Sequence, residues 1–291
     1  MAKVTLITGC STGIGFETAL LMAQRGYRVY ATMRKPDTDA QALLDAAKAG
    51  SAELQVCQLD VTNQESIDRC VGGLLKTEAS IDVLVNNAGI AELRVVEDTT
   101  DEFTHAIFET NVFGPLRMMR SVLPGMRERQ SGTIVNVSSV AGRIGAFGQT
   151  LYCGTKHALE AISEGLAIEV RRFGVRVAII EPGIFNTPMV VKGVASLSGA
   201  SASPYAATER QLAGIYTGGL AADAHPRAVA EAIEHAVSTE QPRLRYPVGV
   251  DAKVFLEGRA RLSDEEWVEF GAPMSDEDFW ALWARTFPMP S

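Results

Sequence analysis

The chain has 291 residues, of which 46% are hydrophobic and 21% charged, and 35 acidic against 27 basic side chains give a formal net charge of −8. This composition is typical of a folded globular protein and excludes a disordered chain, which would combine low hydrophobicity with high charge. The acidic balance also argues against a nucleic-acid partner, which would need a basic stripe, and against docking on anionic lipid.

The N-terminal residues predict a strand and not a targeting segment. The short apolar run that ends at Ile7 is followed by Gly9, Gly13 and Gly15, whereas a signal peptide would continue the run to a small-residue cleavage site. Elsewhere no apolar run reaches the roughly 20 residues that a membrane span requires. We therefore expect a cytoplasmic protein with no membrane span.

The sequence shows no local pattern of metal ligands. Its four cysteines form no CxxC pair and its four histidines form no HExxH pair, so we expect no zinc site. Four cysteines in a chain of 291 residues are also too few for a disulfide scaffold.

Short β-branched runs alternate with longer helical patterns along most of the chain. The runs predict strands at 4–8, 28–32, 53–59, 83–86, 133–138, 176–180 and 244–246. The stretches between them predict helices at about 14–25, 38–49, 64–78, 99–129, 150–172 and 226–238. Several strands are almost wholly apolar, as in a parallel sheet covered on both faces. The alternation predicts a single doubly wound, Rossmann-type α/β domain over residues 1–291, with about seven strands.

Two segments depart from this alternation. Residues 186–225 are rich in Ser, Ala and Gly and weakly periodic, which is typical of an irregular lid or binding loop. Residues 249–291 hold all three tryptophans, and within them 263–267 and 275–279 each place Ser before a group of acids. These two phrases predict two short capped helices. The aromatic side chains of this tail could cover a pocket, pack on their own domain or join subunits.

The segment 8–15, Thr-Gly-Cys-Ser-Thr-Gly-Ile-Gly, leads from the first predicted strand into the first predicted helix. Glycines let backbone N–H groups approach a pyrophosphate, and the helix N-terminus adds partial positive charge. The position of the glycines between strand and helix therefore predicts a dinucleotide site and disfavours a simple tight turn. The candidate cofactor-binding residues of this loop are Gly9, Ser11, Thr12, Gly13, Ile14 and Gly15.

The second predicted strand ends in Met33 and Arg34. A site that prefers NAD places a carboxylate near this point, about 20 residues beyond the glycines, where it binds the ribose 2′-hydroxyl. Here no carboxylate would repel a 2′-phosphate, and a guanidinium can bind one through two hydrogen bonds. We interpret Arg34 as a sign of NADP(H), the alternative being that Arg34 and Lys35 are solvated surface residues.

Tyr152 and Lys156 stand four residues apart, on one face of a predicted helix. A neighbouring ammonium favours the phenolate form of tyrosine, and a tyrosine activated in this way can serve as acid or base for a carbonyl–alcohol pair. The spacing alone is common by chance. Ser139, which closes an apolar strand, and Asn111 strengthen the interpretation.

This chain resembles the short-chain dehydrogenase/reductase family in the order and spacing of its motifs. The resemblance rests on segment 8–15, Asp60-Val61, Asn86-Asn87-Ala88-Gly89, Asn111, Ser139, Tyr152, Lys156 and Pro182-Gly183. The resemblance covers roughly residues 1–190. The interval between Gly9 and Gly13 is similar to that of the compact single-domain branch. The segment 30–34, Tyr-Ala-Thr-Met-Arg, is similar to that of the NADP-dependent hydroxysteroid and retinol dehydrogenases.

The resemblance implies a role for each matching residue. Tyr152 would exchange a proton with the substrate oxygen, and Ser139 would hydrogen-bond that oxygen. Lys156 would hold the nicotinamide ribose and lower the pKa of Tyr152, and Asn111 would position a water that links Lys156 to solvent. The remaining cofactor contacts would be Asp60 and Val61 for adenine, Asn87, Ala88 and Gly89 around the adenosine ribose, and Pro182, Gly183, Ile184 and Thr187 for the nicotinamide.

The substrate pocket is the least defined part of the prediction. Gly145, Phe147, Gln149 and Met189 lie near the matched motifs and, with Ser139, are the candidate substrate contacts. Phe147 and Met189 would form an apolar wall, although core packing explains them equally well. A lipophilic ketone or alcohol, such as a steroid-, retinoid- or aryl-ketone-like compound, follows from the subgroup resemblance alone.

The sequence therefore predicts an NADP(H)-dependent oxidoreductase that interconverts a small-molecule ketone or aldehyde and an alcohol. One alternative is an NAD-dependent alcohol dehydrogenase of the same fold that acts on sugar-derived or aryl alcohols. Another is a non-catalytic NADP-sensing regulator, which is disfavoured because such proteins usually lose Tyr or Lys of the active pair. The resemblance also implies a homodimer or homotetramer, assembled through the helices that hold Asn111 and Tyr152.

Overall fold

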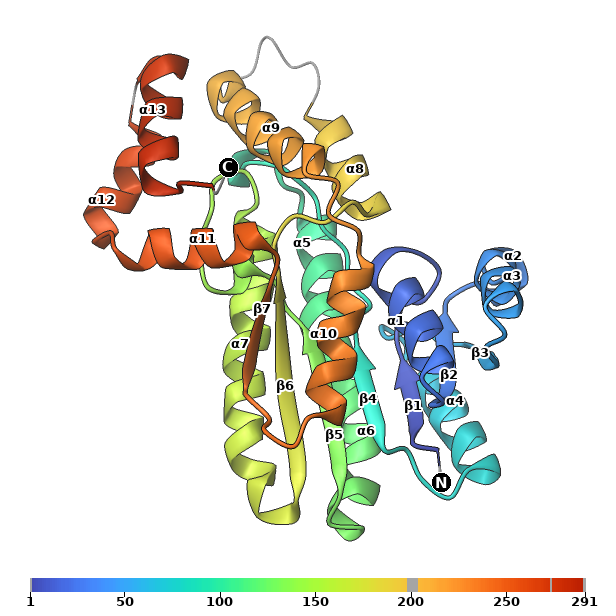
Figure 1. The fold of residues 1–291 in the computed structure, drawn as a ribbon. Coiled ribbons are helices and arrows are strands. Elements are labelled where there is room, and N and C mark those ends of the chain that lie inside the picture. Colours follow the sequence, from blue (N-terminus) through green and yellow to red (C-terminus); the bar gives the residue numbers. More distant parts are fainter. Residues whose placement is uncertain (1, 198–203, 273, 290–291) are drawn as a thin grey trace.

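The computed structural model of the chain describes residues 2–197, 204–272 and 274–289. Its centre is a parallel sheet of seven strands in the order β3-β2-β1-β4-β5-β6-β7 (Figure 1). The strands are β1 (Val4–Ile7), β2 (Arg28–Met33), β3 (Leu54–Gln58), β4 (Val83–Asn86), β5 (Gly132–Val137), β6 (Val175–Pro182) and β7 (Arg245–Val248). This order, in which the chain reverses direction across the sheet between β3 and β4, confirms the predicted Rossmann-type α/β fold.

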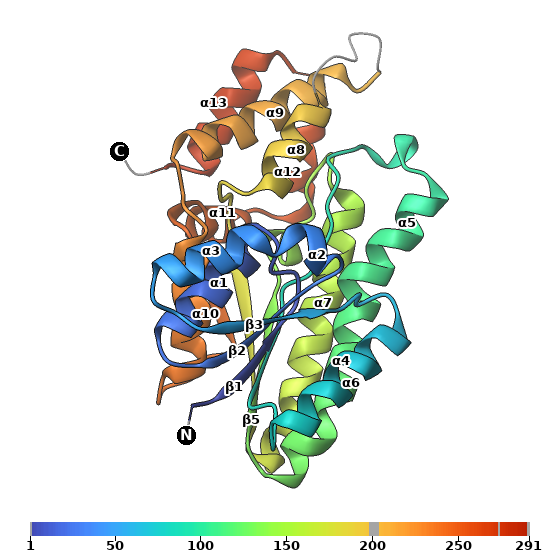
Figure 2. The same cartoon turned by 90° about the vertical axis from the view of Figure 1, so that its right-hand side faces the viewer.

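Helices cover both faces of the sheet (Figure 2). One face carries α1 (Gly13–Gln24), α3 (Gln41–Ala49) and α10 (Arg227–Ser238). The other carries α4 (Gln64–Thr77), α6 (Gly114–Glu128) and α7 (Thr150–Val170). Two further helices connect these layers to the strands, α2 (Pro36–Asp39) before α3 and α5 (Asp101–Phe108) before α6.

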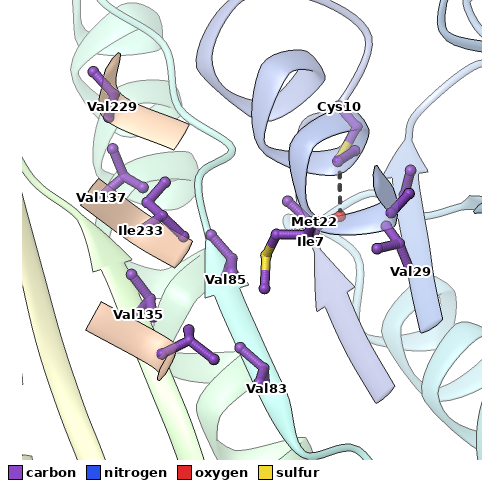
Figure 3. Packing of buried hydrophobic residues seen from close by; sticks show 14 of the residues in the cluster. Ile7, Cys10, Met22, Val29, Val83, Val85, Val135, Val137, Val229 and Ile233 are labelled. Atoms are coloured by element: carbon purple, nitrogen blue, oxygen red, sulfur yellow. Dashed lines mark hydrogen bonds between the residues drawn. The ribbon is translucent and has the colours of Figure 1, made fainter. Parts of the chain in front are cut away.

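Alternation along the strands divides the apolar residues between two cores. Neighbouring strand residues point to opposite faces, so Ile7 packs under α1 and α10 while Leu6 packs under α4 and α6. In Figure 3, Val85 and Val137 of the strands lie near Met22 of α1 and Ile233 of α10, in the first of these cores. Continuous apolar strands are required because both faces of the sheet are buried.

The helix expected over 99–129 is present but interrupted. It consists of α5, a π-helical turn at Glu109–Phe113, and α6. Thr100 caps α5 by accepting a hydrogen bond from the Phe103 N–H at 3.2 Å. The wider π turn changes the direction in which Asn111 points, and such turns are frequent at functional sites.

The irregular lid expected over 186–225 is largely helical, so that part of the prediction was wrong. It contains α8 (Pro188–Ser196) and α9 (Ala206–Ala221), and residues 198–203 of the predicted lid lie outside the described residues. Thr187 caps α8 and Pro188 occupies its first turn, a favourable start for a helix. Alanine has the highest helix propensity of all residues, so an Ala-rich segment can form a helix despite weak periodicity.

The described part of the tail forms three α-helices and a short 3-10 helix (Glu269–Gly271), where two helices were expected. The expected pair is α12 (Asp264–Val268) and α13 (Asp276–Thr286), capped by Ser263 and Ser275. The additional α-helix is α11 (Val250–Ala260), which follows β7 directly. Both views place α8, α9 and α11–α13 beyond the same end of the sheet. Among the described helices, none has the length and apolar character needed to cross a membrane.

Candidate active site

The glycine loop lies where β1 ends and α1 begins. Gly9 has a φ of 73°, and a side-chain carbon there would come within 2.8 Å of the Ala88 Cα, so both the backbone conformation and the lack of space require glycine. Thr12 precedes α1 in an extended conformation and makes no side-chain cap. The first N–H groups of α1 therefore remain available to an anion such as a pyrophosphate.

Residues after β4 hold this loop in place. The Asn87 side-chain amide donates to the carbonyl oxygens of Thr8 and Gly9 at 2.9 and 3.0 Å. The Thr8 hydroxyl accepts from the backbone N–H groups of Asn87 and Ala88, each at 3.0 Å. Asn87 and Ala88, which are predicted to line the adenosine ribose, fix the shape of the glycine loop in this structure.

The carboxyl ends of β2 and β3 lie beside the glycine loop. The Cys10 N–H donates to the Thr32 carbonyl at 2.8 Å, and the Leu59 N–H donates to the Met33 carbonyl at 3.0 Å. These bonds bring Arg34 and Asp60, the next residues along each segment, to the edge of the sheet that carries the glycines. Arg34 is exposed, and no carboxylate of the described residues lies within ion-pair distance of it. Val61, next to Asp60, is buried against the start of α6.

Tyr152, Lys156 and Ser139 come together as the sequence predicted. Tyr152 and Lys156 occupy successive turns of α7, and the Lys156 Nζ lies 5.6 Å from the centre of the Tyr152 ring. The ammonium donates to the Val137 carbonyl at 2.8 Å, at the end of β5. Ser139 follows two residues later, and its hydroxyl donates to the Pro182 carbonyl at 3.4 Å. Ser139 and Tyr152 both line the same cavity.

Burial shifts both titrating groups toward their neutral forms. Loss of hydration raises the pKa of Tyr152 to about 12, an effect that the neighbouring Ser139 hydroxyl partly offsets. Burial lowers the pKa of Lys156 to about 8, and the Glu160 carboxylate acts in the opposite direction. Burial therefore governs the pKa of Tyr152 in this structure, and Lys156 is not among the groups that shift it.

Asn111 bridges the loop after β4 to α7. Its Oδ1 accepts from the Ile90 N–H, and its Nδ2 donates to the Ile90 carbonyl, both at 2.9 Å. The same Nδ2 lies 3.1 Å from the Thr155 hydroxyl, one residue before Lys156. Gly89 lies directly against this amide. The π-helical turn thus places Asn111 beside the helix that carries Tyr152 and Lys156.

The residues expected to hold the nicotinamide end of the cofactor form the turn after β6. The Asp251 carboxylate at the start of α11 accepts from the Ile184 N–H at 2.5 Å. A side-chain carbon at Gly183 would come within 2.3 Å of that carboxylate, so only glycine fits. Burial raises the pKa of Asp251, and the Ile184 N–H partly offsets the shift. Thr187, at the end of the turn, lies against Gly13 of the glycine loop.

A partly open, mainly apolar cavity adjoins Tyr152 and Ser139. Of the predicted substrate contacts, Phe147, Gln149 and Met189 line it, and Gly145 does not. Gly145 instead accepts a hydrogen bond from the Trp267 indole N–H at 2.8 Å, through its carbonyl oxygen. The other lining residues include Leu93, Val140, Ile144, Leu212, Ile215, Tyr216, Phe255, Trp267, Trp283 and Phe287.

The aromatic tail forms one side of this cavity and also packs on itself. Phe270, Phe279 and Phe287 form a buried cluster of their own, and Phe279 contacts Phe147 edge to face at 6.1 Å between ring centres. Trp267 and Trp283 belong to the same aromatic group and line the cavity. Two of the three roles left open for the tail, covering the pocket and packing on its own domain, therefore occur together.

Within the described residues, no three His, Cys, Asp or Glu side chains gather in a way that could hold a metal ion.

Residues 3–197 match the family model described as short chain dehydrogenase. The chain belongs to the short-chain dehydrogenase/reductase family.

Individual relatives agree with this assignment. The chain is 35% identical to mouse 17-beta-hydroxysteroid dehydrogenase type 1 over 95% of this chain and 81% of that protein. A crystal structure of a short-chain dehydrogenase from Streptomyces avermitilis superimposes with a TM-score of 0.77 at 38% identity, covering 94% and 99% of the two chains. Actinorhodin polyketide ketoreductase, solved with NADPH, gives a TM-score of 0.74 at 28% identity, covering 84% and 95%.

This short-chain dehydrogenase/reductase has site residues that sequence reasoning missed. Tyr216 and Leu212 on α9, and Phe255 on α11, line the cavity although none belongs to a recognised motif. The sequence places Trp283 and Phe287 in the aromatic tail but does not assign them to the cavity. Clustered tryptophans beside a family match are the one sequence signal that points to this wall, and they do not indicate which side chains face the substrate.

Proposed function

We propose that this chain is an NADP(H)-dependent oxidoreductase that interconverts an apolar ketone or aldehyde and the corresponding alcohol. The observation that carries the proposal is the convergence of Ser139 and Tyr152 on one apolar cavity, with Lys156 one helical turn behind. The glycine loop and the turn at Gly183 and Thr187 supply a cofactor site beside them. When bound there, the nicotinamide would supply or accept the hydride.

The protein residues would handle the proton. In reduction, Tyr152 donates its phenolic proton to the carbonyl oxygen as negative charge develops, and Ser139 donates a hydrogen bond to the same oxygen. The raised pKa of about 12 keeps Tyr152 protonated at neutral pH, as this direction requires. In oxidation, Tyr152 must lose its proton, and the nearby Lys156 ammonium stabilises the resulting phenolate.

Arg34 supports the choice of NADP(H) over NAD(H). Its guanidinium is exposed and unpaired among the described residues, at the end of β2 where an NAD-preferring site would carry a carboxylate. The related ketoreductase was solved with NADPH, and the mouse relative is a 17-beta-hydroxysteroid dehydrogenase. The apolar walls of the cavity favour a lipophilic substrate.

The direct test is oxidation of NADPH in the presence of a panel of lipophilic ketones and aldehydes, followed by loss of nicotinamide absorbance. We expect turnover with at least one class and none in Tyr152→Phe, which keeps the ring but removes the proton donor. NADPH binding, measured by fluorescence, should be unchanged in this variant.

Near-normal turnover by Tyr152→Phe would contradict the proposed mechanism. Silence of the wild-type protein across the panel, combined with tight NADPH binding, would favour a non-catalytic NADP-binding regulator instead.

A further inference from the structure

A hydrogen-bonded pair of polar side chains interrupts the apolar cavity wall. The Tyr216 hydroxyl on α9 donates to the Gln149 Oε1 at 2.9 Å, and both residues line the cavity. Their neighbours in the wall are apolar, among them Phe147, Leu212 and Ile215. A polar group in such surroundings is costly unless it has a hydrogen-bond partner.

The Gln149 amide presents its Oε1 to Tyr216, so that its Nε2 is the free end. Burial and the proximity of Tyr152 raise the pKa of Tyr216, so its hydroxyl remains protonated and donates to the Oε1, which is the acceptor of the amide. The two N–H donors on Nε2 then have no acceptor in the part of the chain that the structure describes.

Gln149 stands close to the reacting centre. It immediately precedes α7, and its carbonyl accepts from the Cys153 N–H at 2.9 Å, which extends the helical turn back to Gln149. Gln149 and Tyr152 both line the cavity. Tyr216, the hydrogen-bond partner of Gln149, lies close enough to Tyr152 for Tyr152 to raise its pKa. The free amide donors therefore open on the same cavity as the proton donor.

We propose that the Gln149 amide binds a second oxygen of the substrate, two or three bonds from the reacting carbonyl. This selects ketones with an acceptor oxygen at the β position, such as β-keto esters, β-keto amides and β-hydroxy ketones, with an apolar remainder in the cavity. Tyr216 acts as a positioning residue, because it holds the amide in the orientation that presents Nε2. The proposal rests on the proposed function, whose site it refines.

Two ketones of matched shape test it, ethyl butyrylacetate and pentyl propyl ketone, which differ in that the second replaces the ester group by two methylenes. In Gln149→Leu, kcat/KM for the keto ester should fall by about tenfold, the value of one hydrogen bond to a buried donor. The value for the plain ketone should change less than about twofold. Gln149→Glu keeps the Tyr216 hydrogen bond but replaces the donor by an acceptor. It should lower kcat/KM for the keto ester at least as strongly as Gln149→Leu does.

Tyr216→Phe should reduce the preference in the same direction but less, because the amide keeps its donors and loses only its fixed orientation. The matched control is Tyr27→Phe, whose hydroxyl bonds Glu234 away from the cavity. It should leave the ratio of the two kcat/KM values unchanged. The proposal would be overturned if Gln149→Leu lowered kcat/KM for both substrates by the same factor, or lowered neither value.

Binding provides a readout that does not depend on turnover. Trp267 and Trp283 line the cavity, so their fluorescence reports entry of a ligand. Weaker binding of the keto ester in Gln149→Leu, with unchanged binding of the plain ketone, would support the inference even if the wild-type protein reduced neither compound, a result that would contradict only the proposed function. If Gln149→Leu turned over both compounds with an unaltered ratio of kcat/KM values, this inference would be contradicted and the proposed function would stand.

Discussion

At the scale of single residues, Ser139, Tyr152 and Lys156 meet where β5 ends beside α7. Tyr152 and Lys156 share one face of that helix, and Ser139 follows the strand, two residues after the carbonyl that accepts from Lys156. Tyr216 and Trp267 reach the same cavity from α9 and α12, and no local pattern relates them to Tyr152. Gly145 was misassigned for a related reason, because adjacency in sequence did not show that its carbonyl faces the Trp267 indole.

Ser139→Ala should lower kcat by roughly 100-fold or more, the typical loss when one hydrogen-bond donor to a developing oxyanion is removed. NADPH affinity should not change, because the serine acts on the substrate oxygen. The matched control is Ser138→Ala, since the neighbouring buried hydroxyl makes no hydrogen bond among the described atoms and does not line the cavity. Steady-state kinetics with equal losses in both variants would show that packing and not chemistry is responsible.

The buried Lys156 should make stability depend on pH. Its pKa of about 8 in the folded protein lies below the ordinary lysine value, so the unfolded chain binds more protons between about 8 and 10.5. Wild-type stability should therefore rise relative to that of Lys156→Met as the pH increases through this window. The rise should be on the order of 1.4 kcal/mol for each unit of pKa shift.

Urea unfolding of both cofactor-free proteins at several pH values measures this difference, in which the contributions of all other titrating groups cancel. A constant difference across the window would mean that the ammonium is as well stabilised in the fold as in water.

At the scale of elements, a strong cap predicts a helix more reliably than hydrophobic periodicity does in an Ala-rich segment. Ser263 forms a capping box with Glu266, which is why α12 could be placed from sequence. The helices α8 and α9 were missed because their Ala, Gly and Ser content suggested a loop. The π-helical turn at Asn111 could not be predicted either, since it arises from the fit between α6 and the loop after β4.

Trp267→Phe should loosen the attachment of α12 to the substrate cavity. The substitution keeps an aromatic ring but removes the donor to the Gly145 carbonyl. We expect KM for an apolar ketone to rise about 2- to 10-fold, as for the loss of one hydrogen bond, with kcat and NADPH affinity little changed. The control is Val268→Ala on the same helix, a side chain that is 72% exposed. A fall in kcat without a change in KM would place Trp267 in the chemical step and contradict this role.

At the scale of the whole molecule, the acidity of the chain is concentrated in one region. Residues 263–284 contain seven acids and no Lys or Arg, and without them the chain would carry 28 acids against 27 bases. Asp264 pairs with Arg259, and Asp276 lies 3.4 Å from Arg210 of α9. The nearly neutral remainder, which includes the glycine loop and Arg34, presents no general repulsion to an anionic cofactor.

Cofactor binding should stabilise the whole fold, and NADPH more than NADH at equal concentration. A ligand that binds only the folded state stabilises it by an amount that grows with its affinity, so a tenfold difference in affinity corresponds to about 1.4 kcal/mol, or roughly 2–4 °C in Tm for a chain of this size. Arg34→Met should remove most of the difference between the two cofactors. Arg69→Met, an exposed arginine on α4, should not.

Thermal unfolding monitored with each cofactor gives the comparison, and kcat/KM for the two cofactors provides an independent check. A larger shift with NADH, or a kcat/KM ratio in its favour, would contradict the choice of NADP(H).

The contact of the Asp251 carboxylate with the turn at Gly183 and Ile184 links the C-terminal segment to the part of the chain that the family shares. The part of the chain that matches the family ends at residue 197, whereas Leu212, Tyr216, Phe255 and Trp283 of the cavity wall lie beyond it. If the cavity binds the substrate as proposed, substitutions in the last third of the chain would change which molecules fit it and leave the glycine loop, Ser139 and Tyr152 unaltered. The same division suggests a cut point for chimeras, in which the C-terminal segment is exchanged between relatives and Asp251 is retained as the coupling to the cofactor side.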